Sequence, residues 1–392
     1  MNSIERRAAI SLALIYSTRM LGLFMILPVF VLYAEKLADI TPFLIGVAIG
    51  IYGLTQAIFQ IPFGIWSDRI GRKPVIIFGL LLFALGSVVA ALATSIEWII
   101  IGRALQGTGA IAAAVMALAA DLTREQHRTK VMAIIGGSIG FSFMLALILG
   151  PILQAWFGVP GIFWLTAVLA LLGILIISFL VPNVQLPKMQ SELSVGRRGL
   201  GLAINNAQLL RLDFGVFILH MVLTAVFVVV PSMLQKQFAL DMADHWQVYL
   251  AVMLASIVLL IPSIIFSEKK QKTKEVLLAA IFLCILSQLS LFQSDLSFWS
   301  FILAMVVFFW GFNLLEATLP SLVSKTCNAG NKGAAMGVFS SSQFFGAFVG
   351  GSASGLILQR YDASGVFLFA AIMLTLWFLV AFSMRKPDHR PS

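Results

Sequence analysis

The sequence predicts an all-α membrane protein with twelve transmembrane helices in two pseudo-symmetric six-helix bundles. Three observations predict this class: the composition, the number of long apolar segments and the repetition of features between the two halves. Hydrophobic residues make up 60% of the 392 positions, charged residues make up 11%, and the mean hydropathy is +0.99. Because soluble domains average about 45–50% apolar and 25% charged residues, we expect a lipid bilayer to be the solvent of this chain.

The apolar segments are each roughly 18–26 residues long, enough to cross a hydrocarbon core of about 30 Å as a helix. The expected spans are 9–33, 43–66, 75–94, 98–120, 131–153, 161–181, 211–234, 246–266, 275–293, 298–323, 333–358 and 364–384. One long polar interval divides them into two sets of six. We therefore expect an N-terminal bundle over 1–182, a cytoplasmic linker over 183–210 and a C-terminal bundle over 211–392.

The charges are distributed unevenly between the two sides of the expected membrane. If the N-terminus is cytoplasmic, 21 of the 26 Lys and Arg residues fall in cytoplasmic segments. This bias follows the positive-inside rule and predicts that both termini are cytoplasmic. The basic cytoplasmic loops then face anionic lipid head groups, which accounts for the net charge of +9 without a nucleic-acid partner.

The two halves repeat each other at an offset of 200 residues. Pro62 ends the second expected span and Pro262 ends the eighth. A charged turn follows each proline, with Asp68 in the first half and Glu268 in the second. Parallel six-span repeats with a polar site between them are a common construction of transporters.

The most specific motif is the turn after the second span. Glycines permit a tight turn there, and an acid is flanked by bases. A basic loop of any membrane protein would not need the spacing G-x-x-x-D-R-x-G-R-K. The motif reads Gly64-Ile-Trp-Ser-Asp68-Arg69-Ile-Gly71-Arg72-Lys73-Pro74. It resembles the signature loop of the major facilitator superfamily.

Further segments resemble motifs of the drug:proton antiporter group in that superfamily. They are Gly102-Arg103-Ala-Leu-Gln106-Gly107 at the fourth span, Asp121-Leu-Thr-Arg124 at its end, and Gly150-Pro151 in the fifth span. The last motif is incomplete, because Ala146 stands where a glycine is usual and Ile152 to Ala155 replace the trailing glycines. This departure weakens the inference to exchange over symport.

The resemblance implies a multi-pass protein of the bacterial inner membrane, with the major facilitator fold. The implied function is proton-coupled secondary transport by alternating access, with efflux of drugs or small metabolites in exchange for protons. The alternatives are a proton symporter for uptake and a non-transporting sensor or channel. The implied partners are a small-molecule substrate, protons and the lipid bilayer, and we expect a monomer.

No enzyme, cofactor or metal site is expected. The sequence has no G-x-x-x-x-G-K-[ST], H-E-x-x-H or G-x-S-x-G motif and no Cys/His cluster. A similar member of the group continues into a small soluble C-terminal domain, which we do not expect within these 392 residues.

Four ionisable residues lie inside expected spans, where each costs at least ~2.5–3.5 kcal/mol by insertion scales. They are Arg19, Arg103, His220 and Glu316. In the resembled fold their helices line the central cavity. Glu316 is the predicted proton carrier, because a low dielectric favours the neutral carboxyl group.

Other residues are expected around this carrier. Asn313 lies one helical turn before Glu316, and His220 is the second candidate for proton transfer. Arg19, Arg103 and Gln106 are expected to organise the cavity. An alternative remains open, in which Glu316 forms a structural ion pair with Arg19 or Arg103.

The signature loop is expected to latch the halves on the cytoplasmic side in the outward-open state. Asp68 would dock at the N-terminus of the eleventh span near Gly337, where helix amides attract negative charge. Arg72 would pair with Asp121 at the end of the fourth span. The full predicted latch is Gly64, Asp68, Arg69, Gly71, Arg72, Asp121 and Gly337.

Overall fold

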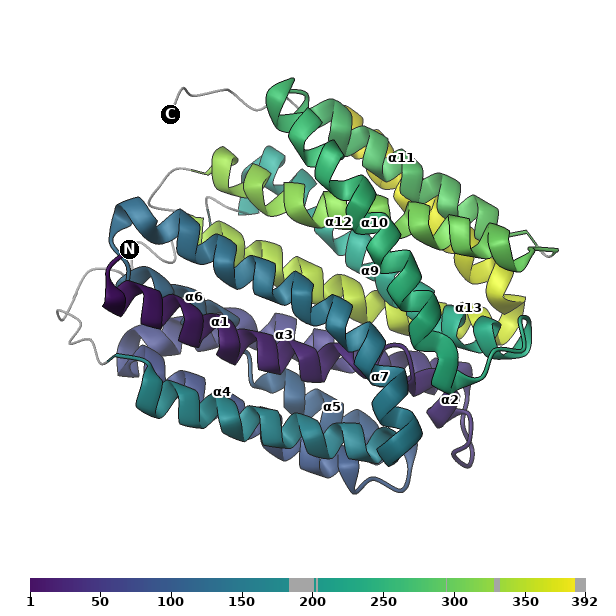
Figure 1. The fold of residues 1–392 in the computed structure, drawn as a ribbon, viewed down its shortest axis with the longest axis horizontal. Coiled ribbons are helices and arrows are strands. Elements are labelled where there is room, and N and C mark those ends of the chain that lie inside the picture. The colour runs from purple at the N-terminus through teal and green to yellow at the C-terminus, as the bar shows by residue number, and fades with distance from the viewer. Residues whose placement is uncertain (183–200, 202–203, 294, 328–331, 385–392) are drawn as a thin grey trace.

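The computed structural model describes residues 1–182, 201, 204–293, 295–327 and 332–384, and these form helices without strands (Figure 1). Most of the predicted linker over 183–210 lies outside the described residues. Its last four residues already belong to a helix, which begins at Ala207. Asn206 caps that helix, since its side chain accepts hydrogen bonds from the first backbone amides.

The N-terminal half supplies the purple-to-teal helices of Figure 1. They are α1 (Ser3–Phe24), α2 (Phe30–Ala34), α3 (Pro42–Ile70), α4 (Arg72–Ala91), α5 (Ile96–Thr108), α6 (Ala112–Asp121), α7 (Glu125–Leu175) and the π-helix η1 (Ile176–Leu180). The C-terminal half supplies the teal-to-yellow helices. They are α9 (Ala207–Lys236), the short η2 (Met242–Asp244), α10 (His245–Lys269), α11 (Thr273–Leu291), α12 (Phe298–Thr326) and α13 (Lys332–Phe382).

Nine helical segments of the described chain are long and apolar enough to cross a membrane. Two of them contain two spans each. The chain breaks inside α7 at Gly158, whose φ of 67° suits glycine, and inside α13 at Tyr361 and Asp362. With α1 and α2 as the first span, the helices agree with the twelve predicted spans.

The turn between α3 and α4 is made by Gly71, which has a φ of 103°. Only glycine adopts this conformation readily, as the signature loop predicted. The α6–α7 turn lies beside it, because Arg72 Nε donates to Asp121 Oδ2 at 3.2 Å. The α10–α11 turn lies at the same end of the C-terminal half (Figure 1), so the turns that carry Arg72, Arg124 and Lys270 share one end of the molecule. We call it the basic end, and the other the opposite end.

The predicted repeat has a counterpart in how each bundle is tied together. At the basic end, Lys73 Nζ donates to the Val181 carbonyl oxygen at 2.6 Å, which joins the third span to the sixth. In the second half, Lys274 Nζ donates to the carbonyl oxygens of Phe382 at 2.8 Å and Met384 at 2.6 Å. Lysines at helix C-terminal carbonyls are stabilising, and here they occupy equivalent positions.

The halves touch at the opposite end along α3 and α13. A methyl group added to Gly46 would lie 2.0 Å from the Gly351 carbonyl oxygen, so the backbones are in close contact. The contact continues to mid-membrane, where Ser341 Oγ donates to the Ala57 carbonyl oxygen at 3.2 Å. Small residues permit such close helix approach within a membrane.

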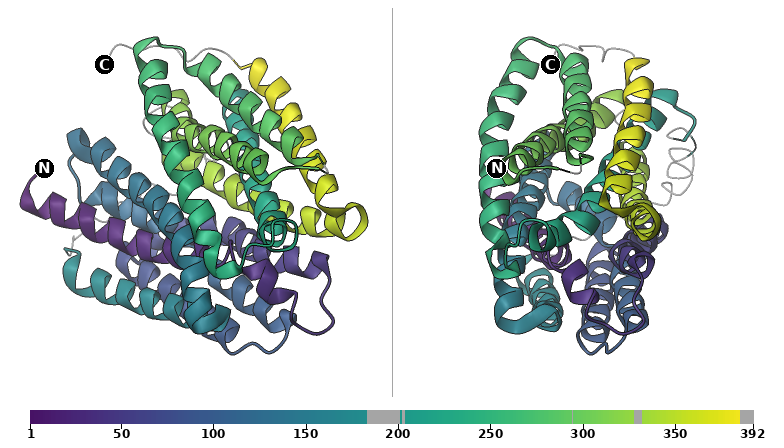
Figure 2. Two further views of the ribbon diagram at one scale, coloured as in Figure 1. Left: turned by 45° about the vertical axis from the view of Figure 1, so that its right-hand side comes forward. Right: turned by 90° about the vertical axis from the view of Figure 1, so that its right-hand side faces the viewer.

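The halves separate toward the basic end. Figure 2 shows the N-terminal and C-terminal helices diverging toward the end where α1 begins. At the start of α13, a methyl group on Gly333 or Gly337 would meet no atom within 4 Å, and the same holds for Gly137 and Gly140 on α7. The structure is therefore open between the halves at the basic end.

Candidate functional site

His220 of α9 and Glu316 of α12 form the central polar pair of the C-terminal half. His220 Nε2 lies 3.6 Å from Glu316 Oε2. The His220 side chain is 12% exposed and that of Glu316 is 40% exposed. The sequence predicted a buried carboxylate, and the structure half-buries it: Glu316 Oε2, which faces His220, is buried with no hydrogen-bond partner among the described residues, while the rest of the carboxylate is accessible. In the described chain Glu316 pairs with neither Arg19 nor Arg103.

Five phenylalanines from both halves cluster beside this pair. The Phe143 ring of α7 lies 5.0 Å from that of Phe24 on α1. Across the boundary between the halves, the same ring lies 6.3 Å from Phe227 and 6.2 Å from both Phe309 and Phe312. Edge-on and tilted contacts at these distances are favourable for aromatic rings. We call these five residues the aromatic cluster.

The aromatic cluster lies on the opposite-end side of the polar pair. Along α9, His220 is two turns nearer the basic end than Phe227. Along α12, Glu316 is one turn nearer the basic end than Phe312, whose ring lies 5.8 Å from the His220 ring. The cluster therefore separates the polar pair from the opposite end, and the pair lies on the open side.

Two amide side chains lie on the helices around the pair, and one of them contacts it. Asn313, expected from the sequence, donates from Nδ2 to Ser256 Oγ of α10 at 3.2 Å. Gln343 of α13 was not predicted, and its Nε2 lies 2.7 Å from His220 Nε2. The sequence feature that could have pointed to Gln343 is the polar run from Ser340 to Gln343 inside an otherwise apolar span.

The structure places Arg19 inside the N-terminal half, away from the space between the halves. Its side chain is fully buried. Arg19 Nη2 donates to Gln56 Oε1 at 2.7 Å and to the Gly109 carbonyl oxygen at 2.9 Å. Its guanidinium also stacks over the rings of Tyr52 and Phe83. The break between α5 and α6 turns the Gly109 carbonyl oxygen toward this charge, and the same oxygen also accepts from the Ile111 amide at 2.9 Å.

Arg103 and Gln106 are buried in the same half and also differ from the predicted cavity positions. Arg103 Nη1 donates to Gln106 Oε1 at 3.0 Å, and Gln106 Nε2 donates to Ser87 Oγ of α4 at 2.7 Å. Arg103 also faces the Tyr52 ring, at 5.2 Å. These contacts join α3, α4 and α5 into one core, so the two arginines organise the bundle from within.

The predicted latch residues lie at the basic end. Arg72 forms ion pairs with Asp68 and with Asp121, the latter at 3.2 Å. The Asp68 side chain is 42% exposed, and a methyl group added to Gly337 at the start of α13 would meet no atom within 4 Å. Gly64 approaches α6, with Ala113 3.3 Å from an added methyl group, and Arg69 is exposed. In this open state the ion pairs of Arg72 join the loop to its own half.

The residues of the incomplete antiporter motif pack against the break between α1 and α2. A methyl group on Gly150 would lie 2.6 Å from the Met25 carbonyl oxygen and 2.9 Å from the Pro28 ring. Pro151 follows inside α7 and is buried. The motif therefore fixes α7 against the first span close to the aromatic cluster.

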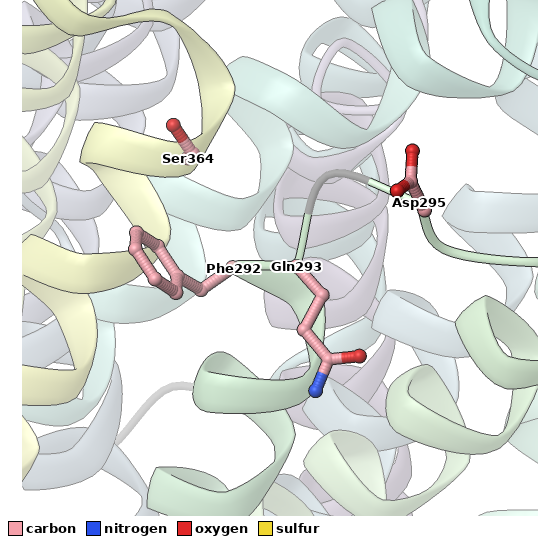
Figure 3. Close-up of a pocket in the computed structure, with 4 residues that line it drawn as sticks. All are labelled: Phe292, Gln293, Asp295 and Ser364. Atoms are coloured by element: carbon pink, nitrogen blue, oxygen red, sulfur yellow. The ribbon is translucent and has the colours of Figure 1, made fainter.

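A surface hollow of about 450 Å³ lies elsewhere, at the opposite end of the C-terminal half. Figure 3 shows its lining of one ring, one amide, one carboxylate and one hydroxyl: Phe292, Gln293, Asp295 and Ser364. It lies away from the boundary between the halves, so we place the candidate site at His220 and Glu316.

Comparisons with known proteins agree with this architecture. The sequence profile described as Major Facilitator Superfamily matches residues 12–339 and 212–392. The chain is 48% identical over 385 residues to the inner membrane transport protein YajR of Escherichia coli strain K12, covering 98% of this chain and 85% of that protein. It is 36% identical over 114 residues, 29% of this chain and 28% of the other, to the class H tetracycline resistance protein of Pasteurella multocida.

Among solved structures, a bacterial homologue of the human lysosomal transporter Spinster, in an inward-facing and occupied conformation, has a TM-score of 0.78. It is 13% identical, and the match covers 100% of both chains. That likeness shows the fold alone. Together with the family match and the YajR relative, it agrees with the twelve spans in two halves. The chain belongs to the Major Facilitator Superfamily and is a multi-pass membrane transporter.

Proposed function

We propose that this protein is a proton-coupled antiporter that exports drugs or small metabolites by alternating access. Its observed state, open at the basic end, is then the inward-open state, because the positive-inside rule assigns the basic end to the cytoplasm. Both termini are cytoplasmic in this proposal. The relative with tetracycline resistance in its name supports export, although it matches less than a third of the chain.

The observation that carries the proposal is the pair of His220 and Glu316. These two titratable groups lie 3.6 Å apart on helices of one half, beside the space between the halves. Ionisable groups within membrane spans are expensive and mark ion and substrate pathways. Uptake of one proton by either member of this pair changes the charge of the pair at the boundary that must open and close, so that protonation favours one of two states.

A transport assay in proteoliposomes tests the proposal. Purified protein is given an imposed pH gradient, and cationic drugs, tetracycline, nucleosides and sugars are screened for saturable accumulation. Antiport moves substrate against the direction of proton flow. Co-movement of substrate and protons would establish the symport alternative, and unsaturable flux would establish a channel.

The Glu316→Gln variant then tests the assigned proton carrier. We expect loss of proton-driven accumulation, while exchange of labelled for unlabelled substrate continues, because the neutral amide keeps the shape of the side chain. The matched control is Glu268→Gln, since Glu268 is an exposed carboxylate at the end of α10. Proton-driven transport that is unchanged in Glu316→Gln removes Glu316 from the mechanism.

A further inference from the structure

The carboxamide of Gln343 reaches His220 from α13, and this contact defines how the imidazole is protonated. On one side of the ring, His220 Nδ1 lies 3.2 Å from the Val216 carbonyl oxygen. A carbonyl oxygen only accepts hydrogen bonds, so Nδ1 carries the proton. In neutral histidine Nε2 then holds a lone pair. The Gln343 amide nitrogen, 2.7 Å away, donates to that lone pair.

A glutamine can bond to either charge state of its partner. Its carboxamide carries a donor and an acceptor, and rotation about the terminal bond exchanges them. When His220 takes up a proton, both ring nitrogens become donors, and Gln343 Oε1 can then accept from Nε2. Glu316 Oε2, at 3.6 Å, is beyond ordinary hydrogen-bond distance of that nitrogen. Gln343 therefore occupies the hydrogen-bonding position at His220 Nε2 that Glu316 could otherwise take.

We propose that Gln343 is a positioning residue of the proton site, which together with the Val216 carbonyl oxygen holds neutral His220 in the Nδ1–H tautomer and turns its carboxamide to accept from the imidazolium. This inference rests on the proposed role of His220 and Glu316 in proton coupling. Gln343 acts through His220, and its own amide does not titrate.

The same stretch of α13 also holds the halves together. Two residues before Gln343, Ser341 donates to the Ala57 carbonyl oxygen of α3 at 3.2 Å. One residue after it, the Phe344 ring lies 6.1 Å from the Tyr52 ring of α3. A change in the bond between Gln343 and His220 therefore acts on the helix that forms the contact between the halves.

Charged groups on the neighbouring helices set the local field. Within the described residues, Glu316 of α12 is the carboxylate within 4.0 Å of the His220 ring. Asp213 lies on α9 itself, seven residues nearer the basic end. Lys325 of α12 and Lys332 of α13 also lie toward that end. The side chain of α13 that contacts His220 is the neutral carboxamide of Gln343.

Nitrogen NMR of histidine-labelled protein tests the inference without relying on transport. The chain has four histidines, and a His220→Gln sample identifies the His220 signals. We expect neutral His220 to show the Nδ1–H tautomer alone in the wild type and a mixture of tautomers in Gln343→Met. The matched control is Gln288→Met, which removes a buried amide from α11.

The outcomes separate this inference from the proposed function. Mixed tautomers in Gln343→Met support the positioning role even where transport shows no proton dependence, and that result would count against the proposed function alone. A wild type with mixed tautomers, or a single unchanged tautomer in Gln343→Met, overturns the role of Gln343 while leaving proton coupling intact. An equal effect of Gln288→Met would also overturn it.

Discussion

The Glu35 carboxylate of the N-terminal half lies 2.8 Å from the Lys236 ammonium of the C-terminal half. Glu35 directly follows α2, and Lys236 is the last residue of α9. The Ser232 hydroxyl, one turn earlier on α9, also donates to this carboxylate at 3.4 Å. Because the two groups belong to different halves, the pair exists only while the opposite end is closed.

This pair should bias the protein toward the observed state by a small amount. Half-exposed ion pairs are worth about 0–1 kcal/mol, so Glu35→Gln should shift the balance up to about fivefold toward the state open at the opposite end. Spin-label distances across the opposite end measure that balance. The charge-swapped double variant Glu35→Lys with Lys236→Glu should restore it. If the charge-swapped double variant populates the observed state no more than Glu35→Gln does, the ion pair has no electrostatic role in stabilising that state.

The close contact between Gly46 and Gly351 should not tolerate a side chain. A methyl group on Gly46 would lie 2.0 Å from the Gly351 carbonyl oxygen, so Gly46→Ala forces α3 and α13 apart. Overpacking costs roughly 1–3 kcal/mol, which would reduce the population of the observed state at least about fivefold. The same spin-label distances report this change.

The matched control is Gly137→Ala on α7, where an added methyl group meets no atom within 4 Å. This control should leave the observed state as populated as in the wild type. Equal behaviour of the Gly46 and Gly137 variants would show that the α3–α13 contact does not define the closed end.

An ion pair between Glu5 and Arg124 should make stability depend on pH at the basic end. Glu5 Oε1 accepts from Arg124 Nε at 2.8 Å and from the Arg124 backbone amide at 3.1 Å. The Arg124 side-chain hydrogen bond holds the pKa of Glu5 well below its usual value of 4.5. A lowered folded-state pKa stabilises the fold above pH 4.5, and that contribution is lost as the pH falls toward the lowered value.

Thermal unfolding in detergent checks this expectation. Glu5→Gln should melt below the wild type from pH 6 to 8, and the gap should narrow as the pH is lowered beneath about 4.5. Glu125→Gln is the control, because it removes an exposed carboxylate one residue from Arg124. A gap that widens in acid would contradict the assigned sign.

The helices and their turns were largely predictable from local sequence. Runs of apolar residues marked the spans because a bilayer requires them, and Gly71 marked the turn because it needs a positive φ. His220 and Glu316 were also singled out as ionisable residues inside spans, each about nine residues from the inner boundary of its span, and they lie 3.6 Å apart. These features depend on chain position and composition alone.

The direction in which a polar side chain points was not predictable. Arg19 lies at a similar depth to His220, but it faces into its own bundle, where Gln56 and the Gly109 carbonyl oxygen accept its hydrogen bonds. Depth along a span carries no information on helix rotation. Gln343 was missed for the same reason, because a single amide in an apolar span resembles many packing residues until its neighbour is known.

Asp68 is the residue by which the proposed latch can be tested. In the open structure it pairs with Arg72 of its own half, while a methyl group added to Gly337 at the start of α13 would meet no atom within 4 Å. When the basic end closes, Asp68 should reach the positive N-terminal end of α13, a contact worth about 0.3–1 kcal/mol or more if partly buried. Asp68→Asn should therefore reduce the basic-end-closed state several-fold and slow transport to match.

The measurement is maleimide labelling of a single cysteine at Gly337, in protein whose Cys284 and Cys327 are replaced by alanine. Labelling should be faster in Asp68→Asn, because the variant keeps the basic end open for longer. The control is Glu268→Gln. Glu268 lies in the equivalent turn of the second half, which lacks the G-x-x-x-D-R-x-G-R-K spacing, so this variant should leave labelling and transport unchanged. Since Asp68 is already exposed and paired in the open state, a normal transport rate in Asp68→Asn would mean that closure of the basic end does not depend on its charge.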